Sequence, residues 1–295
     1  MKNLFHIISK PDNVAIVVMI ILISFFVWLA FHLARMNDKK SPTLKEEENK
    51  IGKEKIHTWP YLARKEFLVA LIVLIILFVW SILIMAPLEE HATPNLTPNP
   101  AKAPWYFLGL QELLVYFDPW IAGVMLPVLI ILGLMLIPYL DVRIKGNGYY
   151  TFKERKFEIL IYGFGFLVLW LPLIIIGVFM RGPGWLWFWP WQEWDKSKVV
   201  ADFNMDFSQV FGVDSRSTLG FIIGGVAVFL YFFAGMMVFY RLLKKKKPEY
   251  LKRLGLMRYF TGSFLVCTMI GVFLKIIFNL VFNINYIWVT PWFNI

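Results

Sequence analysis

Long apolar runs separated by shorter polar stretches dominate the pattern along the chain of 295 residues. A helix needs about 20 mostly apolar residues to cross a bilayer. Six runs reach that length: Val14–Ala34, Phe67–Ala86, Trp120–Leu140, Phe157–Met180, Leu219–Tyr240 and Tyr259–Phe282. The first run is longer than the apolar core of a cleaved signal peptide, so we expect it to remain as a membrane helix. The pattern predicts an all-α integral membrane protein with six transmembrane helices.

Basic residues gather in alternate connections between these runs. Of the 30 Lys and Arg residues, 22 lie in the three stretches Arg35–Lys65, Arg143–Lys156 and Arg241–Arg258. Cytoplasmic loops of membrane proteins carry such an excess of positive charge. The alternation predicts that these stretches face the cytoplasm, where they meet anionic lipid headgroups, and that both termini lie on the outer side.

Composition narrows the classes of function. The chain is 59% hydrophobic, 18% aromatic and 17% charged, with a net charge of +10. The cytoplasmic stretches account for that charge, and no aromatic-interleaved basic patch indicates nucleic-acid binding. The single cysteine, Cys267, excludes a disulfide framework, a thiolate zinc site and an iron–sulfur cluster within the chain. Any redox centre that the protein needs is therefore expected on a partner chain.

The outer connection 87–119 is the most informative stretch. Its six prolines oppose a continuous helix. The run Trp105–Phe117 is apolar and compatible with a helix, but its 13 residues are too few to span, so it is expected to lie in the outer interface. Aromatic rings beside a few polar groups at that depth suit a flat, amphipathic ligand from the membrane. An ordinary aromatic belt is the alternative.

The stretch Asn99–Phe107, which reads Asn-Pro-Ala-Lys-Ala-Pro-Trp-Tyr-Phe, lies between two predicted membrane helices. It resembles the quinol-site loop of the cytochrome b C-terminal domain family, which includes subunit IV of cytochrome b6f-type complexes and bacterial menaquinol–cytochrome c reductases. The resemblance extends from Thr58 to Met180 and includes Ile137–Asp141 and Asn147–Tyr150. The topology derived from the charges independently places the loop on the outer side, where that family oxidises quinol.

The resemblance implies a subunit of a quinol-oxidising complex in the bacterial cytoplasmic membrane. It implies a haem-bearing cytochrome b N-terminal half, a Rieske iron–sulfur protein with its 2Fe–2S cluster and a c-type cytochrome as partners, in a dimeric complex. The b haems are expected on the partner, because only one of the four histidines, His32, lies in a predicted membrane helix. The resemblance assigns quinol binding to Pro104, Trp105, Tyr106 and Phe107, and helical spacing from Glu112 adds Tyr116 to the predicted quinol-binding residues. The resemblance also assigns an inner quinone or haem contact to Phe67, with core packing or lipid contact as the alternative.

The chain departs from the family motif at one position. The family usually has Pro-Glu-Trp-Tyr, whose glutamate is thought to receive a quinol proton, but Pro104 stands at the place of that glutamate. Glu112 is the only carboxylate between Glu90 and Asp118, and on a helix it shares a face with Tyr116 and Gly109. We predict Glu112 as the proton acceptor. The alternatives are that it reaches headgroup water or pairs with a partner subunit.

Two other features of the sequence are a lysine within the last apolar run and an aromatic segment after the fourth. Lys275 lies in the outer third of the last apolar run, and its long side chain is expected to reach water at the interface. The segment Arg181–Asp195 carries six Trp or Phe residues and two prolines, which predicts a rigid amphipathic platform on the outer surface. It is interpreted as an interface anchor, with a cover over the quinol pocket or a docking surface as alternatives.

These observations predict five segments. Residues 1–35 form an additional first helix and residues 36–58 a polar cytoplasmic linker. Residues 59–180 form a module like the cytochrome b C-terminal domain, with the outer loop 87–119. The aromatic outer segment 181–218 follows, and residues 219–295 add two helices and an outer tail. The alternative function is a non-catalytic structural or assembly subunit of a redox complex, and the missing motif glutamate favours it.

Overall fold

The computed structural model describes residues 2–51, 57–85, 91, 93–95, 97–142, 150–200 and 204–295. These residues form helices and irregular segments, and they form no β-strand beyond isolated bridges such as Arg181 with Trp187. Six helical segments are long and apolar enough to cross a membrane. The predicted all-α structure and the six helices of sufficient length and apolar character are therefore confirmed. The side of the membrane on which the termini lie stays a prediction.

The six segments coincide with the six predicted runs, with ends that differ by a few residues. They cover Asn13–Lys40, Thr58–Leu83, Ile121–Leu140, Lys156–Met180, Thr218–Lys246 and Pro248–Phe282. The first belongs to a longer helix, α2 (Pro11–Ile51), so part of the predicted polar linker continues the first membrane helix. The last, α9 (Pro248–Phe282), bends at Gly255, whose φ of +72° is readily adopted only by glycine.

The chain divides into two compact units. The first contains residues 1–4, 98–144 and 157–295, and the second contains residues 5–97 and 145–156. The sequence resemblance runs from Thr58 to Met180, so it crosses this division and does not correspond to either unit alone.

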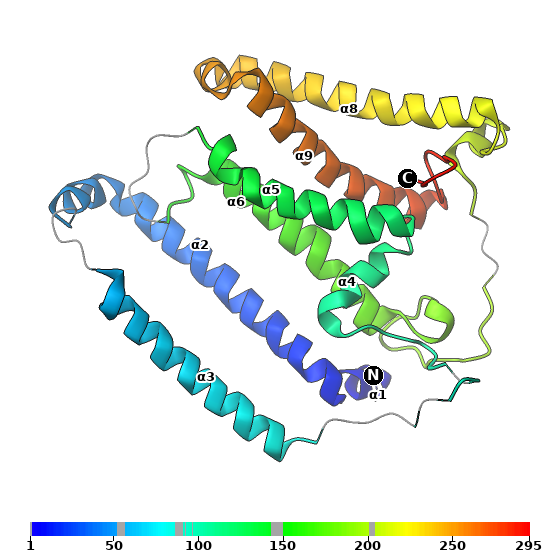
Figure 1. Ribbon diagram of the computed structural model, residues 1–295, viewed down its shortest axis with the longest axis horizontal. Coiled ribbons are helices and arrows are strands. Elements are labelled where there is room, and N and C mark those ends of the chain that lie inside the picture. Colours follow the sequence, from blue (N-terminus) through cyan, green and yellow to red (C-terminus); the bar gives the residue numbers. More distant parts are fainter. Residues whose placement is uncertain are drawn as a thin grey trace. The chain divides into compact units, whose positions relative to one another are not determined.

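The first unit contains four of the six spanning segments together with one short helix (Figure 1). α5 (Leu126–Leu140) follows the π-helical turn η2 (Ile121–Met125), and α8 (Thr218–Lys246) packs on α9. α9 also packs on α5, where the Arg258 guanidinium lies 4.5 Å from the centre of the Tyr139 ring. The short helix is α4 (Trp105–Leu113).

The remaining membrane helix of this unit, Lys156–Met180, is irregular. It comprises α6 (Lys156–Gly163), η3 (Phe164–Trp170), α7 (Leu171–Ile175) and η4 (Ile176–Met180), of which η3 and η4 are π-helical. Pro172 lies at the start of α7 and supplies no backbone N–H to the preceding turn. Widened turns of this kind occur often at functional sites. Here α7 and η4 form the surface against which α4 packs.

The second unit contains α2 and α3 (Ala63–Leu83), which follows the turn η1 (Thr58–Leu62). In α2 the Asn37 side chain donates to the Tyr150 carbonyl, and the Asp38 carboxylate accepts from the Lys153 N–H. Phe31 packs on Phe152. α3 has no buried residue along its 21 residues. Its apolar side chains are therefore exposed within this unit.

Candidate functional site: the two faces of α4

The helix α4 separates its residues into a buried and an exposed face. Leu108, Gly109, Glu112 and Leu113 are buried, and their spacing of three and four residues places them on one side of the helix. Tyr106 and Phe107 point away from that side, and each is 53% exposed. The predicted short helix is confirmed, although it ends at Leu113 rather than Phe117.

Close packing holds the buried face of α4 against α7 and η4. A Cβ added to Gly177 would lie 2.8 Å from the Leu108 side chain, and one added to Gly109 would lie 3.2 Å from the Ile174 side chain. Larger residues would force the helices apart because protein interiors leave few gaps. The space beside Gly109, on the face that it shares with Glu112, is therefore filled by Ile174 and Trp170.

The Glu112 carboxylate lies at the centre of the buried face and has no exposed surface. Arg181, the first residue after η4, donates to it from two nitrogens: Nη2 lies 2.7 Å from Oε1, and Nε lies 2.9 Å from Oε2 and 3.1 Å from Oε1. The Tyr116 hydroxyl donates to Oε1 over 2.8 Å, and the Trp185 indole N–H donates to Oε2 over 3.2 Å. Two-point pairing between a guanidinium and a carboxylate is the strong form of this interaction.

A tight turn brings Arg181 and Trp185 to the carboxylate together. The Gly182 N–H donates to the Leu186 carbonyl and the Phe188 N–H to the Met180 carbonyl, so the chain folds back on itself. Gly184 has a φ of +65°, which a residue with a side chain rarely adopts. The turn lets the Arg181 Nη1 donate to the Trp185 carbonyl over 3.1 Å.

The charges of this cluster affect its titrating groups. Burial alone would lower the pKa of Arg181, but the hydrogen bond and the negative charge of Glu112 raise it above the usual value. Burial raises the pKa of Tyr116, and the Glu112 carboxylate raises it further. The guanidinium therefore remains charged, and the phenol keeps the proton that it donates to Glu112.

Hydrogen bonds hold the loop before α4, residues 98–104, at several positions. The Gln111 side chain accepts from the Ala103 N–H over 2.8 Å and donates to the Ala101 carbonyl over 2.8 Å. The Lys102 ammonium donates to the Val178 carbonyl at the end of η4, and the Gly184 N–H donates to the Asn99 side chain. The loop is thus fixed to both α4 and the turn that carries Trp185.

A shallow depression of about 440 Å³ lies between this loop, α4 and the turn. Loop residues 98–101 form one wall, and Gly184 and Trp185 form another. The α4 side is made by Gln111, Leu114 and Val115. Phe107 precedes Gln111 by four residues, so its side chain lies on the same flank of the helix as the depression. The lining is mainly apolar with a few amide groups.

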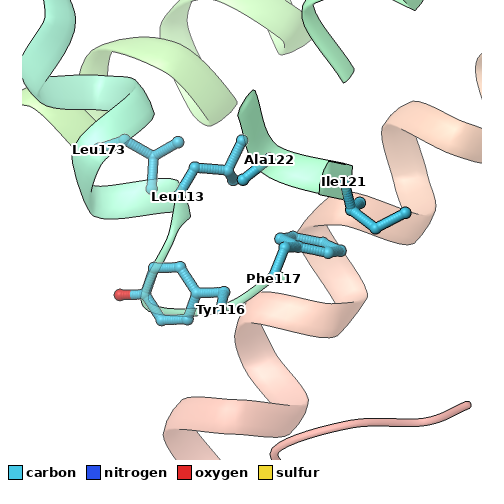
Figure 2. Packing of buried hydrophobic residues seen from close by; sticks show 6 residues of the cluster. All are labelled: Leu113, Tyr116, Phe117, Ile121, Ala122 and Leu173. Atoms are coloured by element: carbon cyan, nitrogen blue, oxygen red, sulfur yellow. The ribbon is translucent and has the colours of Figure 1, made fainter. Parts of the chain in front are cut away.

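Under the turn that follows α4 lies a cluster of buried apolar side chains (Figure 2). It contains Leu113, Tyr116, Phe117, Ile121, Ala122 and Leu173. The Tyr116 hydroxyl points away from Phe117 and Ile121 (Figure 2), and it is this hydroxyl that reaches Glu112. Tyr116 therefore joins the apolar cluster to the buried ion pair.

The aromatic segment 181–195 folds against cations, a feature that the sequence pattern did not predict. The Lys198 ammonium lies 4.3 Å from the centre of the Phe188 ring, and Lys102 lies 4.8 Å from the centre of the Trp194 ring. Trp189 and Trp191 stack on each other with centres 5.4 Å apart and are exposed. Cation–π contacts of this kind favour a fixed arrangement of the segment.

The structure divides the predicted quinol-binding residues. Tyr106 and Phe107 are exposed, Pro104 and Trp105 are near them at the start of α4, and Tyr116 is buried. Phe67 lies in α3 of the second unit and is 70% exposed, with no role assigned by its surroundings. The sequence does not predict a role for Arg181 beyond its place as the first residue of the aromatic segment. Its position directly after a membrane helix, at the same predicted end as the lone carboxylate Glu112, was the available signal.

Among the described residues, no group of three or more His, Cys, Asp or Glu side chains is placed to hold a metal ion. Comparison with known proteins gives no further assignment. No protein-family model, no curated protein and no solved structure matches the chain. A function must therefore be inferred from the residues themselves.

Proposed function

We propose that the chain is a subunit of a quinol-oxidising cytochrome bc-type complex and supplies part of its quinol site. The observation that carries the proposal is the arrangement of the loop Asn99–Pro104 and α4. The loop is fixed in place beside a mainly apolar depression, and the helix after it exposes Tyr106 and Phe107, of which Phe107 lies on the flank that faces the depression. A helix of nine residues cannot span a bilayer, which is consistent with a position at the membrane interface.

The chemistry of the exposed face suits a quinol ring. A quinol is flat and apolar on its faces and carries hydroxyl groups at its ends. Tyr106 and Phe107 offer ring faces and edges for stacking. In the proposed site Pro104 and the half-buried Trp105 also line the surface that binds quinol. Tyr116 contributes indirectly, because its hydroxyl donates to Glu112 on the buried face of α4.

The redox centres of the proposed complex belong to partner chains. Electrons from quinol would divide between a Rieske 2Fe–2S cluster and a b haem, with a c-type cytochrome as the further acceptor. The haem-bearing cytochrome b N-terminal half needs a surface on which to pack. The apolar helix α3, with no buried residue, offers such a surface, and Phe67 lies on it. We propose a dimeric complex in the bacterial cytoplasmic membrane.

The contacts of Glu112 bear on its proposed role. Its assignment as proton acceptor stays a prediction. Both carboxylate oxygens already accept hydrogen bonds from Arg181, Tyr116 and Trp185, and neither is exposed. A proton from quinol reaches Glu112 only if this pair opens, so the contacts favour a role for Glu112 in positioning α4.

One observation favours the alternative of a structural or assembly subunit. The only candidate acid on α4 is closed off in an ion pair, so α4 as it stands offers the depression no carboxylate for proton transfer. In that alternative the aromatic face of α4 contacts lipid or a partner and binds no quinol.

The first experiment is purification of the full chain from its native membrane in mild detergent through an affinity tag. We expect stoichiometric b haem in reduced-minus-oxidised spectra and a Rieske protein among the co-purifying chains. A photoreactive quinol analogue should then crosslink within residues 98–117 or at Trp185. A colourless protein without partners would contradict the proposal. A complete complex whose crosslinks all lie on other chains would favour the structural alternative.

A pair of variants in the purified complex sharpens this test. Phe107→Leu should raise the KM for quinol severalfold, because it removes an exposed ring from the proposed site. Phe211→Leu is the matched control, since Phe211 is also an exposed phenylalanine, 63% exposed, but lies in η6 (Phe207–Phe211), outside α4 and its loop. Equal KM values in the two variants would contradict quinol binding at α4.

A further inference from the structure

Lys275 of α9 is a charged side chain that the proposed site does not use. It was expected to reach water, and that expectation is wrong: the residue is 2% exposed. Its ammonium donates to the Tyr116 carbonyl over 2.8 Å and also to the Asn285 carbonyl. The ring centres of Phe117 and Tyr286 lie 5.4 Å and 5.9 Å from it. Two carbonyls and two rings therefore replace the water that a buried ammonium needs.

The carbonyl that Lys275 holds belongs to the turn after α4. Backbone carbonyls in a buried turn lie outside the regular bonding of a helix, so they need donors from elsewhere. Lys275 supplies a charged donor to the backbone of Tyr116, the residue whose hydroxyl donates to Glu112. The position of α4 is thus fixed at two places, by Arg181 at its buried face and by Lys275 at the turn that follows it.

The C-terminal tail, residues 283–295, supports the same turn. Phe293 and Ile295 pack against the buried cluster under α4. The Asn294 side chain lies 3.4 Å from Asp118 Oδ2 within the turn. The tail is itself folded, because the Ile295 N–H donates to the Trp288 carbonyl and the Trp288 N–H donates to the Ile295 carbonyl.

We propose that Lys275 is a positioning residue of the proposed quinol site, and that α9 with the C-terminal tail belongs to the scaffold of that site. This inference rests on the proposed function. Lys275 acts through the backbone of Tyr116 rather than through the exposed face of α4. The last helix and the tail lie outside the sequence resemblance, and on this inference they set the position of the helix that binds quinol.

The test is Lys275→Met in the intact complex, because methionine is long and apolar but supplies no donor. Lys252→Met is the matched control, since Lys252 lies on the same helix and is exposed. The first readout is hydrogen exchange at each amide. Amides 114–122 and 283–295 should exchange about tenfold faster in Lys275→Met, in line with the loss of a hydrogen bond to a charged donor. The Lys252→Met variant should exchange like the wild type.

The second readout is the steady-state oxidation of a short-chain quinol analogue. A positioning role predicts a KM raised severalfold per complex, whereas a purely structural role lowers the yield of complex and leaves KM unchanged. The inference is overturned by unchanged exchange, by faster exchange spread over the whole chain, or by a local increase without a change in KM. If the wild-type complex oxidises no quinol, the proposed function fails, and the inference that rests on it fails with it. Hydrogen exchange then still reports whether Lys275 holds the turn.

Discussion

The helices α3 and α4 are both apolar, yet their surroundings differ in kind. None of the 21 residues of α3 is buried, and the helix is apolar along most of its length. Of the nine residues of α4, four are buried, and one of them is a glutamate without any exposed surface. The longer helix, α3, is apolar and long enough to span a membrane, whereas the shorter helix, α4, is held by contacts with particular residues such as Arg181.

The comparison shows that apolar character and fixed position come from different sources. A helix such as α3 satisfies its backbone internally and can lie in lipid without a specific partner. Helix α4 is too short for that, and its place is set by Arg181, by the close approach at Gly177 and by Lys275. Substitutions in the two helices and their contacts should therefore have different consequences.

The largest effect is expected from Arg181→Gln. The substitution leaves the Glu112 carboxylate buried beside Tyr116 and Trp185 without its opposite charge. Removing one partner of a buried ion pair costs about 3–5 kcal/mol of folding free energy. Thermal unfolding of the purified protein in detergent should show a clear drop in Tm.

Two further variants control this measurement. Arg216→Gln removes an exposed arginine near the start of α8 and should leave Tm nearly unchanged. The double variant Arg181→Gln with Glu112→Gln should recover part of the loss, because no uncompensated charge is left buried. If Arg181→Gln and Arg216→Gln have the same Tm, the ion pair does not hold α4.

A charge placed in α3 should have the next largest effect. Leu74→Arg puts a guanidinium near the middle of this helix, where an arginine costs about 2.5–3.5 kcal/mol on insertion into a membrane. Protease protection of the full chain in membranes should show a reduced inserted fraction. The counterpart Leu114→Arg, just after α4 on a residue 44% exposed, should change insertion little. Equal effects would remove the distinction between the two helices.

A smaller effect, with a definite dependence on pH, is expected from Tyr116→Phe. Loss of a hydrogen bond to a charged acceptor costs about 1.5–3 kcal/mol. The pKa of Tyr116 is raised above its ordinary value of 10.0, first by burial and then by Glu112. Above pH 10 the unfolded chain gives up this proton while the folded protein keeps it, so the stabilisation by Tyr116 falls.

The measurement is the difference in unfolding free energy between the wild type and Tyr116→Phe over a range of pH. The difference should be constant below about pH 10 and become smaller above it. Tyr106→Phe, at an exposed ring, is the control and should show no such trend. A difference that grows at high pH would contradict the assigned environment of Tyr116.

Much of the architecture follows from the sequence alone. Each of the six apolar runs is a helix long enough to span, because about 20 apolar residues in a row have few stable alternatives in a bilayer. The short helix after Pro104 was also predictable. The run Trp105–Phe117 contains no proline, and it has too few residues to span a bilayer. Sequence likewise drew attention to Glu112 and Tyr116 as neighbours on one face, and they are hydrogen-bonded.

The tertiary structure alone decided what these residues contact. Periodicity gives the face of a helix, but it does not say which distant segment covers that face. Glu112 and Arg181 are 69 positions apart, and Lys275 and Tyr116 are 159 apart, so no local pattern joins them. The order of residues is therefore enough to identify the segments that are helical and apolar enough to span a membrane. The partners of the buried charges were decided by packing, because a charge is stable in the interior only where the fold brings an opposite charge or backbone carbonyls to it.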